Sequence, residues 1–103
     1  MRTSIITDDL ETCFICKGRA SEIHHVMHGW ANRKIADKYV LIVGLCHRCH
    51  NEGPNGVHFN NKTDEWLKRI GQRAFEKEHG HKLWMELFGK NYLNEEEWVI
   101  WTD

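Results

Sequence analysis

Several features that define other classes of protein are scarce in this sequence. There is a single proline among 103 residues and no segment of low complexity, which argues against a disordered chain. No apolar run is long enough to cross a membrane, and the first residues, MRTSIITDDLE, lack the apolar stretch of a secretory signal. We therefore expect a cytoplasmic protein in a reducing compartment, with no membrane partner.

Net charge is also small, at −1, and does not by itself indicate a nucleic-acid partner. The charges are unevenly distributed, however. Between residues 17 and 50 there are six cations and two acids, whereas between residues 64 and 103 there are nine acids and six bases. Because local charge governs contact with phosphates, the first segment is the candidate surface for nucleic acid. An ordinary solvated surface explains the same charges equally well.

Four cysteines form two CxxC pairs, with 29 residues between the pairs. In a reducing compartment this spacing indicates metal binding rather than disulfides. Each pair turns the backbone so that two thiolates face one centre, and two pairs complete a closed tetrahedral site. We expect Gly18 to take the sharp turn after the first pair. The expected structural Zn²⁺ ion is held by Cys13, Cys16, Cys46 and Cys49.

The hydrophobic pattern predicts an α+β protein in which residues 1–103 form a single domain. Strands are expected at residues 21–26 and 39–45, and a loop with at most one helical turn at residues 27–38. A short helix is expected at residues 46–51.

Two further helices are expected in the second half of the chain, at residues 64–79 and 81–88. Thr63 is the expected N-cap of the first, and a glycine ends each. Trp66 and Trp84 are expected in the core. The tail at residues 95–103 carries two more tryptophans, and it either covers the core or meets a partner.

Eight histidines are unusually many for a chain of this length. His24 and His25 follow the first CxxC pair, His50 directly follows the second, and His58 lies eight residues further on. A shared metal ion would bring these distant histidines together. Adjacent strand residues point to opposite faces, so His24 and His25 are expected to do different jobs. The remaining four, His28, His47, His79 and His81, are individually interpreted as surface or core residues.

The segments CFIC, EIHHV, LCHRCHN and GVHFN together resemble the HNH endonucleases of the His-Me finger group, especially small members from phages and prophages. The resemblance covers about residues 13–93. It implies a zinc-stapled ββα-metal finger, treble-clef-like, at residues 13–60, followed by two C-terminal helices within residues 61–103. It also implies a metal-dependent endonuclease or nickase that hydrolyses DNA phosphodiester bonds. The setting would be a bacterial or phage-infected cell, with recombination or replication proteins as partners.

Roles for single residues follow from the same resemblance. His25 matches the general base that activates water. His24 and His50 match ligands of a catalytic divalent ion, Mg²⁺ or Mn²⁺, and His58 is a weaker candidate for a further ligand. The family's central asparagine, which orients the base, has no counterpart at the start of the second strand. Asn32 is the substitute candidate, and a weak or inactive enzyme is the other interpretation.

A few cations complete the predicted site. Arg33, Lys34 and Lys38, in the expected loop, and Arg48, between the second pair of cysteines, are expected to contact the nucleic-acid backbone. Two rival functions stay open: a non-catalytic four-cysteine zinc module that binds nucleic acid or protein, and an interaction protein that acts through its helices and tail.

Overall fold

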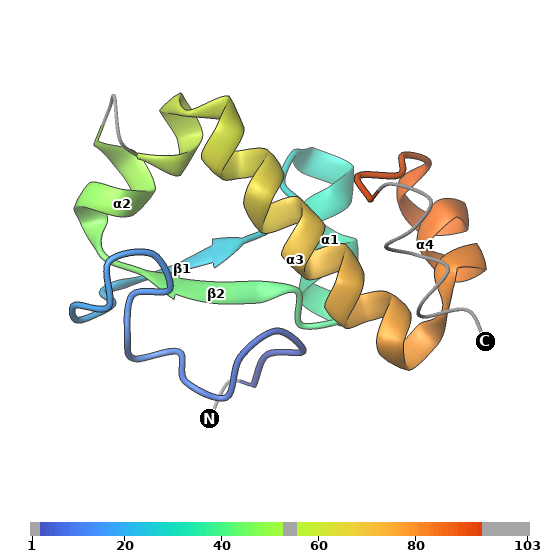
Figure 1. Cartoon of the computed structure of the whole chain (residues 1–103), viewed down its shortest axis with the longest axis horizontal. Coiled ribbons are helices and arrows are strands. Elements are labelled where there is room, and N and C mark those ends of the chain that lie inside the picture. The colour runs from blue at the N-terminus through green and yellow to red at the C-terminus, as the bar shows by residue number, and fades with distance from the viewer. Residues whose placement is uncertain (1–2, 53–55, 94–103) are drawn as a thin grey trace.

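The computed structural model describes residues 3–52 and 56–93, and the tail with its two tryptophans lies outside the described residues (Figure 1). The expected α+β class is confirmed. The elements, in chain order, are β1 (Glu22–His25), α1 (Trp30–Lys38), β2 (Ile42–Leu45), α2 (His47–Asn51), the 3-10 helix η1 (Val57–Phe59), α3 (Asn61–His79) and α4 (His81–Phe88).

The sheet consists of β1 and β2, which pair antiparallel with His24 opposite Val43. All four residues of β2 are buried, which agrees with its apolar sequence. The prediction that this strand begins at residue 39 is wrong, however. Tyr39 is the C-cap of α1, and Val40 has a φ of 51°, a left-handed conformation that interrupts extended backbone.

The prediction of a loop at residues 27–38 is also wrong, because most of that segment forms α1. Only Ala36 of this helix is buried, so the helix has no strong apolar stripe by which a sequence pattern reveals it. Arg33, Lys34 and Lys38 therefore project from a helix rather than from a loop.

Helix α3 begins at Asn61, three residues earlier than predicted. The Asn60 side-chain oxygen accepts hydrogen bonds from the backbone N–H groups of Lys62 and Thr63, at 3.1 and 3.2 Å. Asn60, not Thr63, is thus the N-cap. Gly80 and Gly89 end α3 and α4 as expected.

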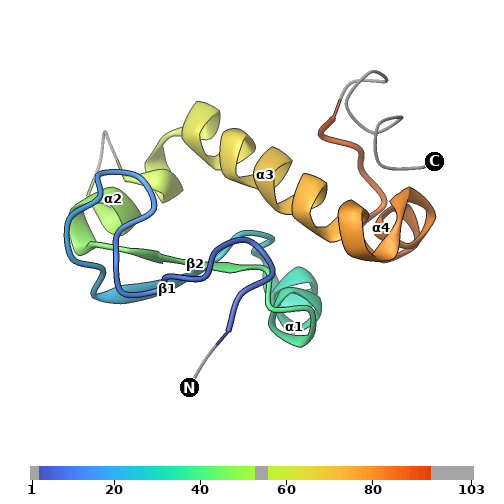
Figure 2. The same cartoon turned by 60° about the horizontal axis from the view of Figure 1, so that its bottom comes forward.

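Helix α3 crosses one face of the sheet, and α1 lies at the end of the strands (Figure 2). Helix α4 folds back at the C-terminal end of α3. Gly71 allows the close approach of α3, since a Cβ there would lie 3.0 Å from Val26. Trp84 is fully buried near Phe75, as expected. The prediction that Trp66 lies in the core is wrong, because this side chain is 43% exposed, with its ring centroid 6.0 Å from that of Phe14. None of the described helices is both long and apolar enough to cross a membrane.

Candidate metal centres

The four cysteines lie together and can hold one metal ion. Their sulfur atoms are all within 4.8 Å of one another, and the Sγ atoms of Cys16 and Cys46 are 3.8 Å apart. In each pair, the backbone N–H of the second cysteine points at the sulfur of the first, at 3.5 Å. The expected cluster of four cysteines is therefore present, and it is consistent with a zinc site.

The turn of the first pair differs from the prediction in one residue. Lys17, not Gly18, takes the left-handed conformation, with a φ of 68°. The Lys17 ammonium donates to the Phe14 carbonyl at 3.1 Å and lies 5.0 Å from the Phe14 ring centroid. These contacts help a lysine to occupy a conformation that glycine adopts more readily.

The two buried thiols, Cys13 and Cys49, differ in how readily they ionise. Burial raises the pKa of Cys13, but hydrogen bonds from neighbouring backbone amides, that of Cys16 first, outweigh it and bring the pKa to about 6. Burial raises the pKa of Cys49 to about 12, and the adjacent sulfur atoms add to this effect. A cation among the sulfur atoms would remove this penalty, because coordinating thiols are deprotonated.

Three histidines form a second cluster. His24 comes from β1, His50 from α2 and His58 from η1, and one ring nitrogen of each lies within 4.8 Å of the others. The Nε2 atoms of His50 and His58 are 2.9 Å apart. The CxxC pair at residues 46–49 supplies most of α2, so the cysteine cluster fixes the position of His50 relative to β1.

His24 is the buried member of this cluster, at 1% exposure. Its pKa is lowered to about 3, first by burial and then by the neighbouring imidazoles, so the ring is neutral at neutral pH. Its Nε2 is buried without a hydrogen-bond partner among the described residues. A buried, unpaired ring nitrogen is costly unless something binds it, and a metal ion fits that requirement.

Glu22 orients the cluster, and the sequence interpretation missed it. Its carboxylate accepts hydrogen bonds from Nδ1 of His50 at 2.6 Å and from Nδ1 of His47 at 2.9 Å. These bonds lower the pKa of Glu22 and raise that of His47. With Nδ1 of His50 engaged, its Nε2 is left to face the cluster, as in metal-bound histidines. The spacing was a usable signal, since strand residues 22 and 24 share a face.

His28 was interpreted as an ordinary surface or core residue, but it borders the same cluster. Its ring centroid lies 5.4 Å from that of His58. Its Nε2 is 2.8 Å from Oδ1 of Asp64, which also pairs with Lys68 at 2.9 Å. Burial raises the pKa of Asp64, but these two partners outweigh it and the pKa falls. No sequence pattern around residue 28 or 64 predicts the contact between His28 and Asp64, because it depends on how α3 crosses the sheet.

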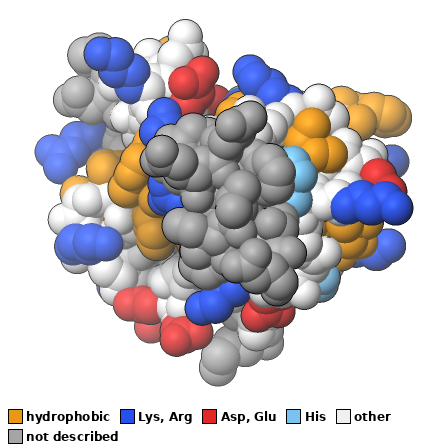
Figure 3. All heavy atoms as spheres, turned by 45° about the vertical axis from the view of Figure 1, so that its right-hand side comes forward, with side chains coloured by type: hydrophobic (Ala, Val, Ile, Leu, Met, Phe, Trp, Pro, Cys, Tyr) orange, Lys and Arg blue, Asp and Glu red, His pale blue; other side chains and the backbone are white. Residues whose placement is uncertain are grey.

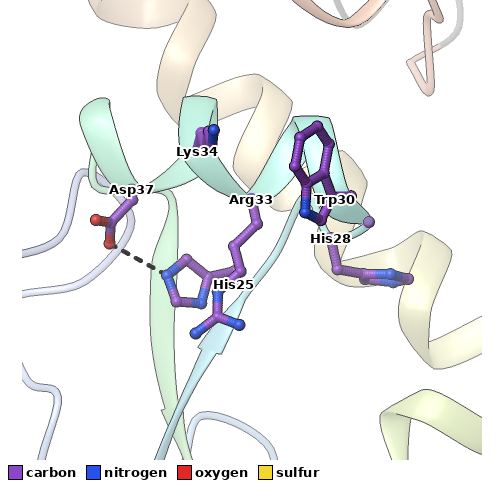
Figure 4. Close-up of a pocket in the computed structure, with 7 residues that line it drawn as sticks. His25, His28, Trp30, Arg33, Lys34 and Asp37 are labelled. Carbon is purple, nitrogen blue, oxygen red and sulfur yellow. Dashed lines mark hydrogen bonds and ion pairs between the residues drawn. The ribbon is translucent and has the colours of Figure 1, made fainter.

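His25 lies on the other face of β1 from His24, yet it lines a cavity of about 180 Å³ together with the histidine cluster. Arg33 lines the same cavity from α1. Figure 4 shows the His25 ring and Asp37 turned toward each other, with the Arg33 side chain extending from α1 toward that ring. The His25 Nε2 and the Asp37 Oδ1 are 3.2 Å apart.

A larger hollow, of about 630 Å³, adjoins this cavity along α1. It shares His25, His28 and Arg33 with the first cavity and adds Trp30, Lys34 and Asp37 (Figure 4). Trp30 is 86% exposed, the highest value among the large hydrophobic residues described. Cations and an exposed aromatic ring thus border the histidine cluster.

Three predicted site residues are not brought to these cavities. Asn32 lies on α1 and lines neither of them. Lys38 lies at the other end of α1, where its ammonium is 5.6 Å from the Tyr39 ring centroid. Arg48 is exposed on α2. On the face in Figure 3, Lys and Arg side chains are scattered among acidic and hydrophobic ones rather than gathered in a single patch.

Comparison with family models, curated proteins and solved structures gives no match for this chain. The chemistry of the two clusters therefore has to be argued from their own atoms. Four sulfur atoms offer a closed site for a borderline-soft ion, and three imidazoles beside a cavity offer an open one.

Proposed function

We propose that this protein is a metal-dependent nuclease that hydrolyses phosphodiester bonds of DNA, with His25 as general base and a divalent ion held by His24, His50 and His58. The observation that carries the proposal is the convergence of these three imidazoles on a cavity that His25 and Arg33 also line. Such an ion would neutralise charge on the scissile phosphate and on the leaving oxygen.

The cysteine cluster, on this proposal, holds a structural zinc ion in a treble-clef-like finger. Thiolates bound to zinc at ~2.3 Å in a tetrahedron lie ~3.8 Å apart. The Sγ atoms of Cys16 and Cys46 are 3.8 Å apart, which supports that interpretation. Four protein ligands leave zinc no open position, so the chemistry belongs to the histidines.

The donor set of the histidine cluster bears on the choice of ion. Nitrogen ligands ~2.1 Å from an ion, at right angles, are ~3 Å apart, and the Nε2 atoms of His50 and His58 are separated by 2.9 Å. Imidazole suits first-row transition ions better than Mg²⁺, which prefers oxygen. We therefore propose a first-row transition ion ahead of Mg²⁺ as the activating metal, and use Mn²⁺, the most weakly bound of them, as the exchangeable ion in the tests.

His25 is suited to accept a proton because one of its nitrogens is already engaged. Asp37 accepts a hydrogen bond at Nε2 of the ring, which leaves the lone pair of the neutral ring on Nδ1. A water molecule in the cavity that His25 shares with the histidine cluster can give its proton to that lone pair. Asp37 thus does what the absent central asparagine was expected to do, and Asn32 is not needed for it.

Arg33 supplies the positive charge on the substrate side of this site. It lines both cavities, and its guanidinium has the fork geometry that binds phosphate oxygens with two hydrogen bonds. Lys34 lines only the larger hollow and would contact a phosphate further along the strand. Lys38 and Arg48, which lie outside both cavities, are left as peripheral contacts with DNA.

A plasmid-nicking assay tests the proposal. Wild-type protein with Mn²⁺ should convert supercoiled DNA to nicked circles, and His25→Ala should reduce the rate by about 10²–10⁴-fold. His79→Ala is the matched control, since His79 is exposed, lies at the end of α3 and lines neither cavity. Equal nicking by wild type and His25→Ala would remove His25 as base.

The rival function is a zinc module without catalysis, and the cysteine cluster alone is compatible with it. That function gives no reason for an unpaired buried nitrogen on His24. It predicts one metal ion per chain, held by sulfur, and no second ion in a titration with Mn²⁺. Metal counting on wild type and His24→Leu therefore distinguishes the two functions.

A further inference from the structure

We infer that the hollow along α1 is a binding site for an unpaired nucleobase, which stacks on Trp30 while its strand runs into the histidine cavity. This inference rests on the proposed function and names its substrate class, a single-stranded or locally unpaired segment of DNA.

The first argument is the exposure of Trp30. Its side chain is 86% exposed, whereas the side chain of Trp84 is completely buried. Leaving so large an apolar ring in water gives up the free energy that burial would provide. Trp30 also lies at the first turn of a nine-residue helix and, within residues 3–52 and 56–93, is not among the side chains that form or pack against either part of the buried core. Apart from the Lys34 ammonium over its ring, these residues leave the indole exposed, so it is available to a ligand.

The second argument is the shape and lining of the hollow. Its volume of about 630 Å³ falls in the range typical of sites for small molecules. Its lining includes the indole ring of Trp30 and the polar groups of His25, Arg33 and Asp37, which lie apart from that ring in Figure 4. A nucleobase has the same two characters, an apolar face for stacking and a polar edge for hydrogen bonds.

The third argument is continuity with the proposed reaction site. His25, His28 and Arg33 line both the hollow and the smaller cavity with the histidine cluster. A strand whose base sits on Trp30 therefore has its adjoining phosphate beside Arg33. The Lys34 ammonium, 4.8 Å from the Trp30 ring centroid, adds positive charge at the same place. An aromatic platform among cations is the arrangement that binds single strands with little sequence preference.

We expect the hollow to distinguish unpaired from paired DNA bases. In a duplex each base is already stacked between its neighbours, and using it here would require unstacking and unpairing. An unpaired base pays little of that cost. Single strands, gaps and loops should accordingly bind more tightly than a continuous duplex.

Equilibrium binding without added divalent ions tests this inference separately from catalysis. The probes are a short fluorescein-labelled DNA strand, the same strand with its bases replaced by abasic sites, and the matching duplex. The proteins are wild type, Trp30→Ala, Trp30→Phe and Trp66→Ala, each checked for fold by circular dichroism. Trp66 is the control, because it is a partly exposed tryptophan that lines neither cavity.

Trp30→Ala should weaken binding of the normal strand by roughly 5–150-fold, the range expected for loss of one stacked base. Trp30→Phe should restore most of the affinity, and Trp66→Ala should bind like wild type. The abasic strand should bind equally to wild type and Trp30→Ala. The inference is overturned if Trp30→Ala binds the normal strand like wild type, or if it loses as much affinity for the abasic strand or the duplex. If these binding results are obtained but the protein does not nick DNA, the catalytic proposal is refuted and the base-binding site is still supported.

Discussion

Glu22 connects the histidine cluster to the cysteine-bearing helix through one carboxylate. It accepts from His50 at 2.6 Å and from Asn51 at 2.9 Å. Replacing it by glutamine keeps the shape but removes the charge that sets the His50 ring. We expect Glu22→Gln to weaken binding of Mn²⁺ by about 10–100-fold, as measured by calorimetric titration. Glu65→Gln, on the exposed side of α3, is the matched control, and equal affinity in both variants would refute the role of Glu22.

For Asp37 we predict a different effect, because this residue contacts the proposed base and not the proposed metal ligands. Asp37→Asn should lower the nicking rate by about 10–100-fold while leaving Mn²⁺ affinity unchanged. Rates at saturating DNA and Mn²⁺ provide the first measurement, and the calorimetric titration provides the second. If affinity and rate fall together, Asp37 supports the metal site rather than His25.

His24 makes the folded state sensitive to acid. Its pKa falls from 6.5 to about 3 on folding, chiefly because it is buried. Below pH 6.5 His24 is protonated in the unfolded chain but stays neutral in the folded chain. The free energy of unfolding therefore decreases as the pH falls from 6.5 toward 3. Without an ion on the histidines, this residue should cost about 2–3 kcal/mol between pH 6.5 and about pH 4.5.

Urea unfolding at several pH values checks this effect in wild type and His24→Leu. The leucine variant keeps the other acid-sensitive groups, including the cysteines, and should lose only the part of the slope that comes from His24. Parallel slopes for the two proteins would contradict the prediction.

Sequence spacing predicts some residues of the site but not others. The four cysteines, His24, His50 and His58 come together as expected, because two CxxC pairs sharing one centre bring β1 and α2 to the same place. Asp64 comes from α3 and pairs with His28 across 36 residues, a contact set by helix packing. Asp37 was likewise missed, since it faces His25 only because α1 is a helix.

At the scale of elements, the errors have local causes. The apolar run at residues 39–45 predicts a long strand, but Val40 in a left-handed conformation delays β2 until Ile42. Helix α1 buries a single residue, so periodicity could not reveal it. Helices α3 and α4 were predicted well because their apolar residues recur at helical spacing and glycine ends each one.

Gly44 in β2 gives a test of how tightly the elements are packed. A Cβ at this position would clash with the Leu10 carbonyl and lie 2.9 Å from the Ala20 side chain. The first obstacle is backbone, which cannot move aside as a side chain can. We expect Gly44→Ala to lower the free energy of unfolding by about 3 kcal/mol or more, measured by urea denaturation.

Gly18→Ala is the matched control for that substitution. A Cβ at residue 18 would meet only the Cys16 sulfur, at 3.4 Å, which is an ordinary contact. Its backbone is not in the left-handed region, which Lys17 occupies instead. Gly18→Ala should therefore change the free energy of unfolding by less than about 0.5 kcal/mol. A similar loss in both variants would mean that packing at Gly44 is not the cause.

At the scale of the whole molecule, the proposed function would assign stability to the cysteine cluster and chemistry to the histidine cluster. The buried core is in two parts, one around the cysteines and β2 and one between α1, α3 and α4. Cys13 and Cys49 belong to the first part, so an ion on the cysteines would be an integral part of the fold. The histidine cluster borders a cavity and includes the exposed His58, so an ion there would exchange with solvent.

Stepwise removal of metal should separate these two roles. A weak chelator should abolish nicking while the helical circular-dichroism signal and one zinc per chain remain, because only the histidine-bound ion is lost. A strong chelator should then remove the zinc and unfold the first part of the core, since structural zinc contributes about 10–16 kcal/mol in small zinc domains. Restoring Zn²⁺ alone should recover the fold without nicking, and adding Mn²⁺ should recover nicking. The variant His24→Leu should have no histidine-bound ion to lose to the weak chelator but should still lose zinc and fold to the strong one. Loss of fold and activity at the same chelator strength would mean that the two clusters act as a single site.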